Sequence, residues 1–201
     1  MTSQISRRRL LFTLISASIV SLSTAHAAAN AAAAKYVSSI GDDIVDLANG
    51  PTRGRALRSK FTSLLSRHVN LQSIAMSSLG TYRGKLPARD KTKFNQLVTT
   101  YAAALFVWYA DDFKGQKFVV DGTTSQGKAV LVSTKITSSN FSTEPIVWKL
   151  SGSGGGFKVI DLKIRGVWLS IAMRDAFSRE LKKSKGDFEQ LYAFLREAET
   201  W

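Results

Sequence analysis

The sequence predicts an α+β fold in which helices at both ends of the chain pack on a twisted, four-stranded antiparallel sheet. Apolar residues recur at helical spacing up to about residue 110, then at every second position, and again at helical spacing after residue 166. Such a succession of helices, strands and closing helices is typical of the α+β class. The chain has 201 residues and no cysteine, so packing alone must hold the fold, and disulfides and thiolate metal sites are excluded.

The N-terminus has the features of a cleavable signal peptide over residues 1–27. Three arginines at 7–9 precede an apolar run, Leu10–Val20, and Ala25-His26-Ala27 has the small-x-small pattern of a cleavage site. The apolar run is too short to span a bilayer core, which takes about 20 residues; an uncleaved anchor or a buried helix is the alternative. The arginines also fit a twin-arginine signal loosely, but nothing downstream suggests a cofactor loaded in the cytoplasm, so we favour the ordinary secretory route.

Residues 28–201 would then form one domain outside the cytoplasm, because the remaining length suits a single core. The whole chain has a formal net charge of +13, and loss of the three signal arginines leaves about +10. Outside the cytoplasm, such a basic surface favours anionic membranes or acidic proteins as partners over nucleic acid. A basic surface kept only for solubility is the other interpretation.

Amphipathic helices are expected in the first half of this domain and at its end. Gly50-Pro51 stops the first helix, and a connector that ends at Pro87 follows the third. The apolar stripe of the fourth helix consists of Phe94, Leu97, Val98, Tyr101, Leu105 and Trp108. The expected helices cover residues 30–48, a run from Arg53, 71–79, 88–110, 167–183 and 187–198.

Strands are expected where apolar and polar residues alternate and where Gly, Ser, Thr and Asn separate the segments. In the third strand, Ile146, Trp148 and Leu150 share one face. The glycine-rich stretch Ser151–Gly156 predicts a hairpin turn, since it lacks the Lys-Ser/Thr ending and the following helix of a phosphate-binding loop. The expected strands form an antiparallel meander over residues 116–121, 127–137, 144–151 and 156–165.

The sequence contains no recognisable catalytic or metal-binding constellation, so we expect neither an enzyme nor a cofactor. His68 is the one histidine outside the expected signal peptide, and a satisfied or solvent-facing role fits it better than that of a base. Adjacent side chains in Asp42-Asp43 and Asp111-Asp112 point in different directions and do not form a metal site. Asp161 lies in an apolar strand, where a carboxylate needs a cation or a helix end as partner, or else has a raised pKa. A small hydrolase that uses Asp161 is the weakest hypothesis.

The chain carries more apolar surface than one thin layer needs, on several helices and on both faces of the sheet. A curved sheet that faces helices can leave a gap between the layers, and such gaps hold ligands. An ordinary filled core explains the same residues. Composition and periodicity alone leave both interpretations open.

Several motifs follow one another along nearly the whole domain. They are Leu79-Gly80-Thr81-Tyr82-Arg83, then Phe94 and Tyr101, then the run Phe157–Leu169, and then Phe177. Together they resemble the MlaC family, also called the toluene-tolerance or ABC-transporter auxiliary family. Its pattern is a leucine-glycine followed by an aromatic-arginine pair, and later an aromatic-x-Val-x-Asp-Val-x-x-x-Gly-Val-Ser-Leu run. The chain departs from this pattern at Trp168, where the family has a small polar residue, and at Tyr82 and Phe157, where tryptophan is common.

The resemblance implies a periplasmic phospholipid carrier, in which helices and a twisted sheet enclose an apolar pocket for the acyl chains. It also implies partners, since a monomeric carrier would shuttle lipid between an outer-membrane lipoprotein complex and an inner-membrane ABC transporter complex. Which strand face looks inward is inferred from alternation, and a one-residue error would exchange the faces. The lining would come from Leu105, Trp108, Phe118, Val120, Val130, Val132, Ile146, Trp148, Leu162, Ile164, Val167, Leu169 and Met173.

Arg83, Arg165 and Arg174 are the candidates for the mouth of that pocket, where a guanidinium can bind a phosphate through two hydrogen bonds. Ordinary surface arginines are the other interpretation. Two alternatives to the phospholipid carrier stay open. One is a carrier of hopanoid-type lipids from the same wider family. The other is a periplasmic interaction module whose pocket has filled in, as the bulky Trp168 and the basic surface suggest.

Overall fold

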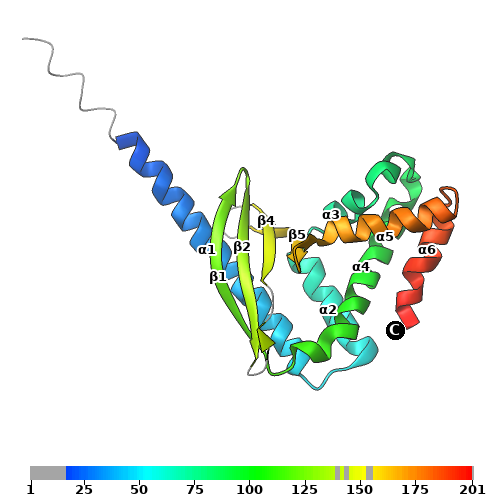
Figure 1. Ribbon diagram of the computed structural model, residues 1–201, viewed down its shortest axis with the longest axis horizontal. Helices are drawn as coiled ribbons and strands as arrows, with labels where there is room; N and C mark the ends of the chain where they lie inside the picture. The colour runs from blue at the N-terminus through cyan, green and yellow to red at the C-terminus, as the bar shows by residue number, and fades with distance from the viewer. Residues whose placement is uncertain (1–16, 139–140, 143–144, 153–155, 201) are drawn as a thin grey trace, which may run out of the picture.

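The structure is a computed structural model that describes residues 17–138, 141–142, 145–152 and 156–200. A sheet with the long helix α1 (Ala17–Asn49) across its back lies beside a group of helices (Figure 1). The predicted α+β class and the antiparallel sheet are confirmed. None of the helices in the described part is long and apolar enough to cross a membrane. The predicted signal peptide, residues 1–27, lies largely outside the described residues, and its cleavage stays a prediction.

The helices follow the predicted order. Asn70 begins the third by accepting a hydrogen bond from the Ser73 backbone at 3.0 Å, and Asp187 begins the last by accepting one from the Glu189 backbone at 2.9 Å. After α1 come α2 (Gly54–His68), α3 (Leu71–Ser78), α4 (Lys91–Tyr109), α5 (Leu169–Lys183) and α6 (Phe188–Glu197). Short 3-10 helices occupy Gly80–Lys85 (η1), Ala88–Asp90 (η2), Ala110–Phe113 (η3) and Ala198–Thr200 (η4).

The four predicted strands pair in sequence order, each antiparallel to the next. They are β1 (Lys117–Gln126), β2 (Ala129–Ser138), β4 (Ile146–Ser151) and β5 (Lys158–Ile164). Two further strands extend the sheet, because β3 (Phe141–Ser142) pairs with β2, and β6 (Val167–Trp168) pairs with β5. Two residues are too few to show alternation, so the predicted count of four strands is too low.

Several boundaries differ from the predictions, and part of one prediction is not described. The first helix was expected from residue 30, but α1 already begins at Ala17. β1 continues past Asp121 to Gln126, where mostly exposed polar residues pair with β2 without an apolar period. Val167 was predicted to begin a helix, but it pairs with Ile164 in β6, and α5 begins at Leu169. The middle of the predicted Ser151–Gly156 turn lies outside the described residues.

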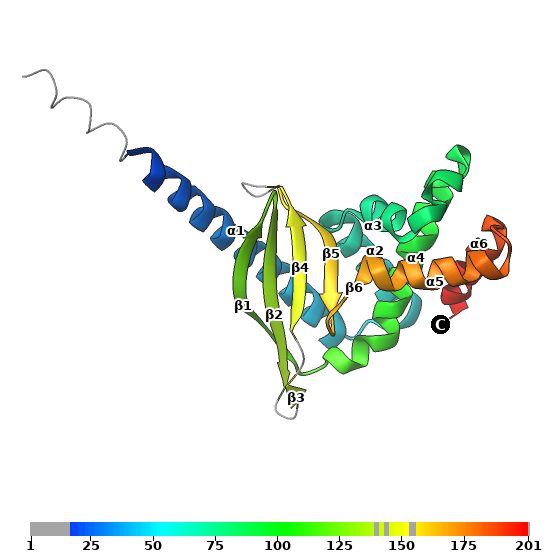
Figure 2. The same ribbon diagram turned by 45° about the horizontal axis from the view of Figure 1, so that its top comes forward.

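One of two apolar clusters lies between the sheet and the helices α1, α2 and α4, and we call it the sheet-side cluster. The helix α1 crosses the back of the sheet in both views (Figures 1 and 2). The first strands of the sheet and the first two helices therefore share one core. The buried residues of the cluster are Ala33, Val37, Ile40, Leu57, Phe61, Leu64, Ala103, Phe106, Ala110, Val130, Val132, Trp148, Leu150, Phe157 and Val159.

The second apolar cluster lies among α3, α4, α5 and α6, and we call it the helix-side cluster. Figure 2 shows these four helices gathered beside the sheet, away from α1. The helix α4 belongs to both clusters, because its first half packs here and its second half packs in the sheet-side cluster. The buried residues are Ile74, Ala75, Leu79, Leu86, Phe94, Leu97, Val98, Met173, Phe177, Leu181, Phe188, Leu191, Tyr192 and Leu195.

Candidate functional site

The inward face of the sheet carries most of the strand residues predicted to line a pocket. In one row across β2, β4 and β5, Val132 lies opposite Trp148, and Trp148 lies opposite Leu162. Ile164 is 44% exposed, because it lies at the end of β5, at the turn into β6. The predicted residues found in the sheet-side cluster, buried or partly buried, are Phe118, Val120, Val130, Val132, Ile146, Trp148 and Leu162. That they contact a ligand stays a prediction.

The polar atoms behind this apolar wall are hydrogen-bonded. Trp148 is buried, and its indole Nε1 donates to the Thr134 hydroxyl oxygen at 2.9 Å. That hydroxyl in turn donates to the Ile146 carbonyl oxygen at 3.2 Å. Because a buried indole N–H without a partner would be costly, the threonine lets tryptophan present its ring to the cluster. The Phe118 ring meets the Trp148 ring edge to face, with centroids 5.9 Å apart.

Helix α1 lies directly against the first strand at one glycine. A Cβ atom on Gly41 would lie 2.1 Å from Cδ1 of Phe118, a separation that real side chains do not adopt. Glycine therefore allows the Phe118 ring to sit against the backbone of α1. The α1 residues Val37 and Ile40 are fully buried on the same side of the helix. The layer between helix and sheet is thus closed tightly at this point.

The structure does not bring the two predicted positions on α4 into the sheet-side cluster. Trp108 is 67% exposed, and Leu105 is only half-buried. The helix meets the cluster through Ala103 and Phe106 instead, and the Phe106 ring stacks on Phe61 with centroids 3.7 Å apart. One helix face serves the helix-side cluster in the first half of α4, and another serves the sheet in the second. A prediction that assumes one apolar face along the whole of α4 therefore assigns the wrong face to its C-terminal half.

The structure also places three predicted lining residues near the start of α5 outside the sheet-side cluster. Val167 is 49% exposed in β6. Met173 is buried in the helix-side cluster, and Leu169 packs partly buried against the same cluster. The helix α5 leaves the sheet after the β5–β6 turn and packs against α3 and α6, which a local sequence pattern does not reveal.

The three arginines predicted at a pocket mouth are divided between η1, α5 and the β5–β6 turn. Arg83, exposed on η1, lines a small surface depression with residues of α3. The exposed Arg174 places its aliphatic stem against Gly80, within the helical group. Arg165 occupies a left-handed backbone conformation, with a φ of 50°, in the turn between β5 and β6. That any of the three binds a headgroup stays a prediction.

Asp161, one of the ionisable residues singled out in the sequence, has hydrogen-bond partners at the start of α5. One carboxylate oxygen of Asp161 accepts hydrogen bonds from the Leu162 and Ser170 backbone N–H groups, and the other accepts one from the Ser170 hydroxyl at 2.6 Å. Asp161 thus caps the first turn of α5, the helix-end partner that was one of its expected roles. Among the described residues, no group of three histidine or acidic side chains is placed to hold a metal ion.

His68 is half-buried against α1. Its Nδ1 atom lies 3.1 Å from the hydroxyl of Tyr36, which donates to the His68 carbonyl oxygen at 3.4 Å. Burial lowers the pKa of His68, and the nearby Arg67 lowers this pKa further, whereas Asp43 acts in the opposite direction. The satisfied role expected for this histidine is the one it has.

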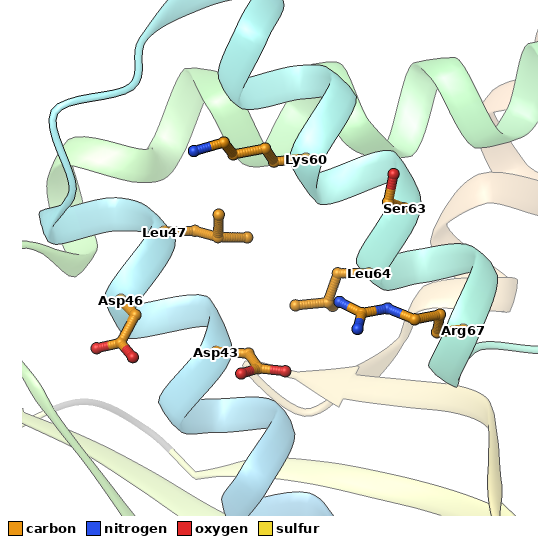
Figure 3. A pocket seen from close by; sticks show the side chains of 7 residues that line it. All are labelled: Asp43, Asp46, Leu47, Lys60, Ser63, Leu64 and Arg67. Atoms are coloured by element: carbon orange, nitrogen blue, oxygen red, sulfur yellow. The ribbon is translucent and has the colours of Figure 1, made fainter.

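Sequence reasoning missed a cleft of about 390 Å³ between α1 and α2 (Figure 3). Its lining consists of Asp43, Asp46 and Leu47 on α1 and Lys60, Ser63, Leu64 and Arg67 on α2. Leu64 is buried and Leu47 is partly buried in the sheet-side cluster, so the same leucines line both the cleft and that cluster. The sequence does contain a pattern that indicates this cleft. The acidic residues of α1 are spaced to share one helix face, and so are the basic residues of α2.

Comparison with known proteins supports the fold described above. The MlaC protein family matches the chain over residues 39–197. Among solved structures, the phospholipid-binding protein from Ralstonia solanacearum in complex with a phospholipid is similar, with a TM-score of 0.68 and 16% sequence identity. The similarity covers 86% of this chain and 97% of that one. No curated protein matches the chain significantly. Since the family match spans well over half of the residues, the chain belongs to the MlaC protein family.

Proposed function

We propose that the chain binds a phospholipid, with its acyl chains in the sheet-side cluster, and carries it through the periplasm. In this proposal it shuttles lipid between an outer-membrane complex and an inner-membrane ABC transporter, and it does so without catalysis. The observation that carries the proposal is the sheet-side cluster itself, a continuous apolar layer between the sheet and three helices. Membership of the MlaC family and the phospholipid-binding structural relative support the same function.

The physical need for a carrier is large. Moving a lipid with some 30 methylene groups through water exposes apolar surface that costs roughly 24 kcal/mol, at about 0.8 kcal/mol for each methylene. A carrier must shield nearly all of this surface, yet it must bind the lipid little better than a bilayer does, or it could not release it. Apolar walls without strong headgroup binding meet both requirements.

Acyl chains can enter the sheet-side cluster only if its layers separate. The Phe61 and Phe106 rings are stacked, and the Phe118 ring lies against Gly41, so helices and sheet are in close contact at these points of the cluster. This close packing also favours a second candidate, an interaction module of the same fold that binds no lipid. The two candidates differ in one observable, the presence of lipid in the folded protein.

Lipid extraction and native mass spectrometry of the purified protein test the proposal. We expect one phospholipid per chain, or uptake of one from vesicles by the lipid-free protein. Extraction also identifies the lipid class, so a hopanoid-type lipid in its place would reassign the cargo. A folded protein that neither carries nor accepts lipid would establish the interaction module instead.

A charged residue in the sheet-side cluster separates the two candidates further. Trp148→Glu places a carboxylate in the apolar wall, and we expect it to abolish lipid uptake. Phe118→Ala alters the same wall without burying a charge, and we expect it to change uptake while circular dichroism still reports a folded protein. Val119→Glu is the matched control, because Val119 is 48% exposed, and we expect its uptake to equal that of the wild type.

A further inference from the structure

The cleft between α1 and α2 is lined by opposite charges from its two walls. On α1, Asp43 and Asp46 are three residues apart, so their side chains share one face of the helix. On α2, Lys60 and Arg67 are two helical turns apart and also share a face. Figure 3 shows Asp43 and Arg67 extending toward each other from the two helices. The cleft therefore has an acidic wall and a basic wall.

These charges face one another without forming ion pairs. Among the described residues, no salt bridge within 4.0 Å joins Asp43 or Asp46 to Lys60 or Arg67. The Lys60 ammonium instead donates to the Thr52 hydroxyl at 2.9 Å, on the exposed side. A single ligand with both charges could therefore bridge the walls, with its cation on the aspartates and its anion on Lys60 and Arg67.

The floor of the cleft connects these charges to the apolar core. Leu64 is 2% exposed and Leu47 is partly buried, and both belong to the sheet-side cluster. A molecule lying across this floor would meet charges at its outer end and apolar side chains at its inner end. The volume of about 390 Å³ falls in the ordinary range for small-molecule sites, roughly 300–1,000 Å³.

We infer that this cleft binds the headgroup of a zwitterionic phospholipid, a phosphodiester that also carries an ammonium group. The inference rests on the proposed function, because it gives the headgroup of the proposed cargo a place beside its acyl chains. The four charged side chains sum to zero, whereas the whole chain carries +13, so the cleft departs locally from an otherwise basic protein. A purely anionic headgroup would be repelled by Asp43 and Asp46, which gives the site a preference between lipid classes.

The test compares uptake of phosphatidylethanolamine with uptake of phosphatidylglycerol, which lacks the ammonium, from mixed vesicles of the two. The wild type should prefer phosphatidylethanolamine, and Asp43→Asn/Asp46→Asn should lower the ratio of the two lipids about tenfold, by the loss of charge-assisted hydrogen bonds. Lys60→Gln/Arg67→Gln should weaken uptake of both lipids. Arg179→Gln/Lys182→Gln is the matched control, because both side chains are exposed on α5, and its ratio should stay at the wild-type value.

A second arm distinguishes a lipid headgroup from a free phosphodiester. Calorimetric titration with water-soluble glycerophosphoethanolamine should show no binding below the millimolar range, because most of the affinity comes from the acyl chains. Submicromolar binding of this soluble compound would overturn the assignment to a lipid.

The outcomes also separate this inference from the proposed function. If the wild type takes up lipid but the Asp43→Asn/Asp46→Asn ratio is unchanged, the headgroup assignment is overturned while the carrier function stands. If the folded wild type takes up no lipid, the carrier function is overturned, and the headgroup site with it. All four cleft positions are exposed or half-buried, so circular dichroism should report the wild-type fold for every variant.

Discussion

The sheet-side and helix-side clusters are similar in composition but are built differently. In the helix-side cluster, Phe94, Phe177 and Tyr192 have no exposed surface, and their rings pack around one another with centroids 6.1–6.5 Å apart. Four helices hold this cluster together. The sheet-side cluster instead lies between two layers, with α1 placed across the sheet and close contact at Gly41.

This difference suggests a division of labour between the clusters. A core enclosed by four helices opens only if packing between several helix pairs is lost at once, whereas two packed layers can separate along one interface. The helix-side cluster would then hold the fold, and the sheet-side cluster would exchange its own contacts for acyl chains. The predictions below test this division.

The largest effect is expected in the helix-side cluster. Phe177→Ala removes a fully buried ring that meets Phe94 edge to face, and it should cost about 3–5 kcal/mol of unfolding free energy. Lipid uptake for each folded molecule should stay near the wild-type value. Denaturant unfolding and vesicle uptake measure the two quantities. The paired variant is Phe106→Ala in the sheet-side cluster, which should lose less stability and change uptake, and the reverse pattern would refute the division.

The contact between α1 and the sheet provides the next test. Gly41→Ala forces the Phe118 ring to move, at a cost of about 1–3 kcal/mol, partly offset by the helix preference of alanine of about 1 kcal/mol. Adding Phe118→Ala should relieve the clash, so the double variant should lose less stability than the sum of the single losses. Thermal unfolding of the wild type, the two single variants and the double variant gives the stability losses for this double-mutant cycle. If the losses simply add, α1 does not lie against Phe118 as described.

Lipid should reduce the effect of Gly41→Ala. If the layers separate when lipid enters, the clash disappears. The difference in unfolding free energy between wild type and variant should then become smaller at saturating vesicle concentration. An unchanged difference would mean that α1 stays against the sheet with lipid bound.

The cap of α5 should have a smaller effect, confined to stability. Asp161→Ala removes the acceptor of the Leu162 and Ser170 backbone bonds and should cost about 1 kcal/mol. Thermal unfolding measures the loss, and Asp161→Asn, which keeps one acceptor oxygen, should lose less. Lipid uptake should be unaffected by either change. Loss of function in a fully folded Asp161→Asn protein would revive a chemical role for this carboxylate.

The smallest expected effect is on the pH dependence of stability. Since burial holds the pKa of His68 below its ordinary value of 6.5, the folded state binds this proton less readily than the unfolded state. Stability should therefore fall as the pH drops below about 6.5, and His68→Gln should remove that part of the loss. Melting temperatures between about pH 7.5 and 5, above the range where most carboxylates titrate, show the difference. A histidine variant with the same pH dependence as the wild type would contradict this expectation.

The elements that could be predicted are those whose pattern depends only on local periodicity. Buried Trp148 and Leu150 alternate with Lys149 and Ser151, and the order of helices and strands follows from such patterns. The pair Val167–Trp168 could not be identified as a strand, because its partner β5 alone determines its conformation. The family resemblance adds the fold as a whole, which the match over residues 39–197 supports.

The candidate site was predicted less well, because it depends on how elements meet. Trp108 and Met173 follow apolar stripes, but the packing of α4 and α5 beside the sheet decides whether each residue faces a cluster or solvent. The charged cleft was missed for the same reason, since Asp43 and Arg67 look like ordinary polar faces until α1 and α2 are placed side by side.

The position of a bound acyl chain shows whether the sheet-side cluster is the lipid pocket. The measurement loads the wild-type protein with a phospholipid that carries a photoactivatable group near the end of one acyl chain, and then maps the labelled peptides by mass spectrometry. We expect labelling in α1, α2, β2 and β4, around the sheet-side cluster. Labelling confined to α3, α5 and α6, or none in a protein shown to be folded, would contradict it.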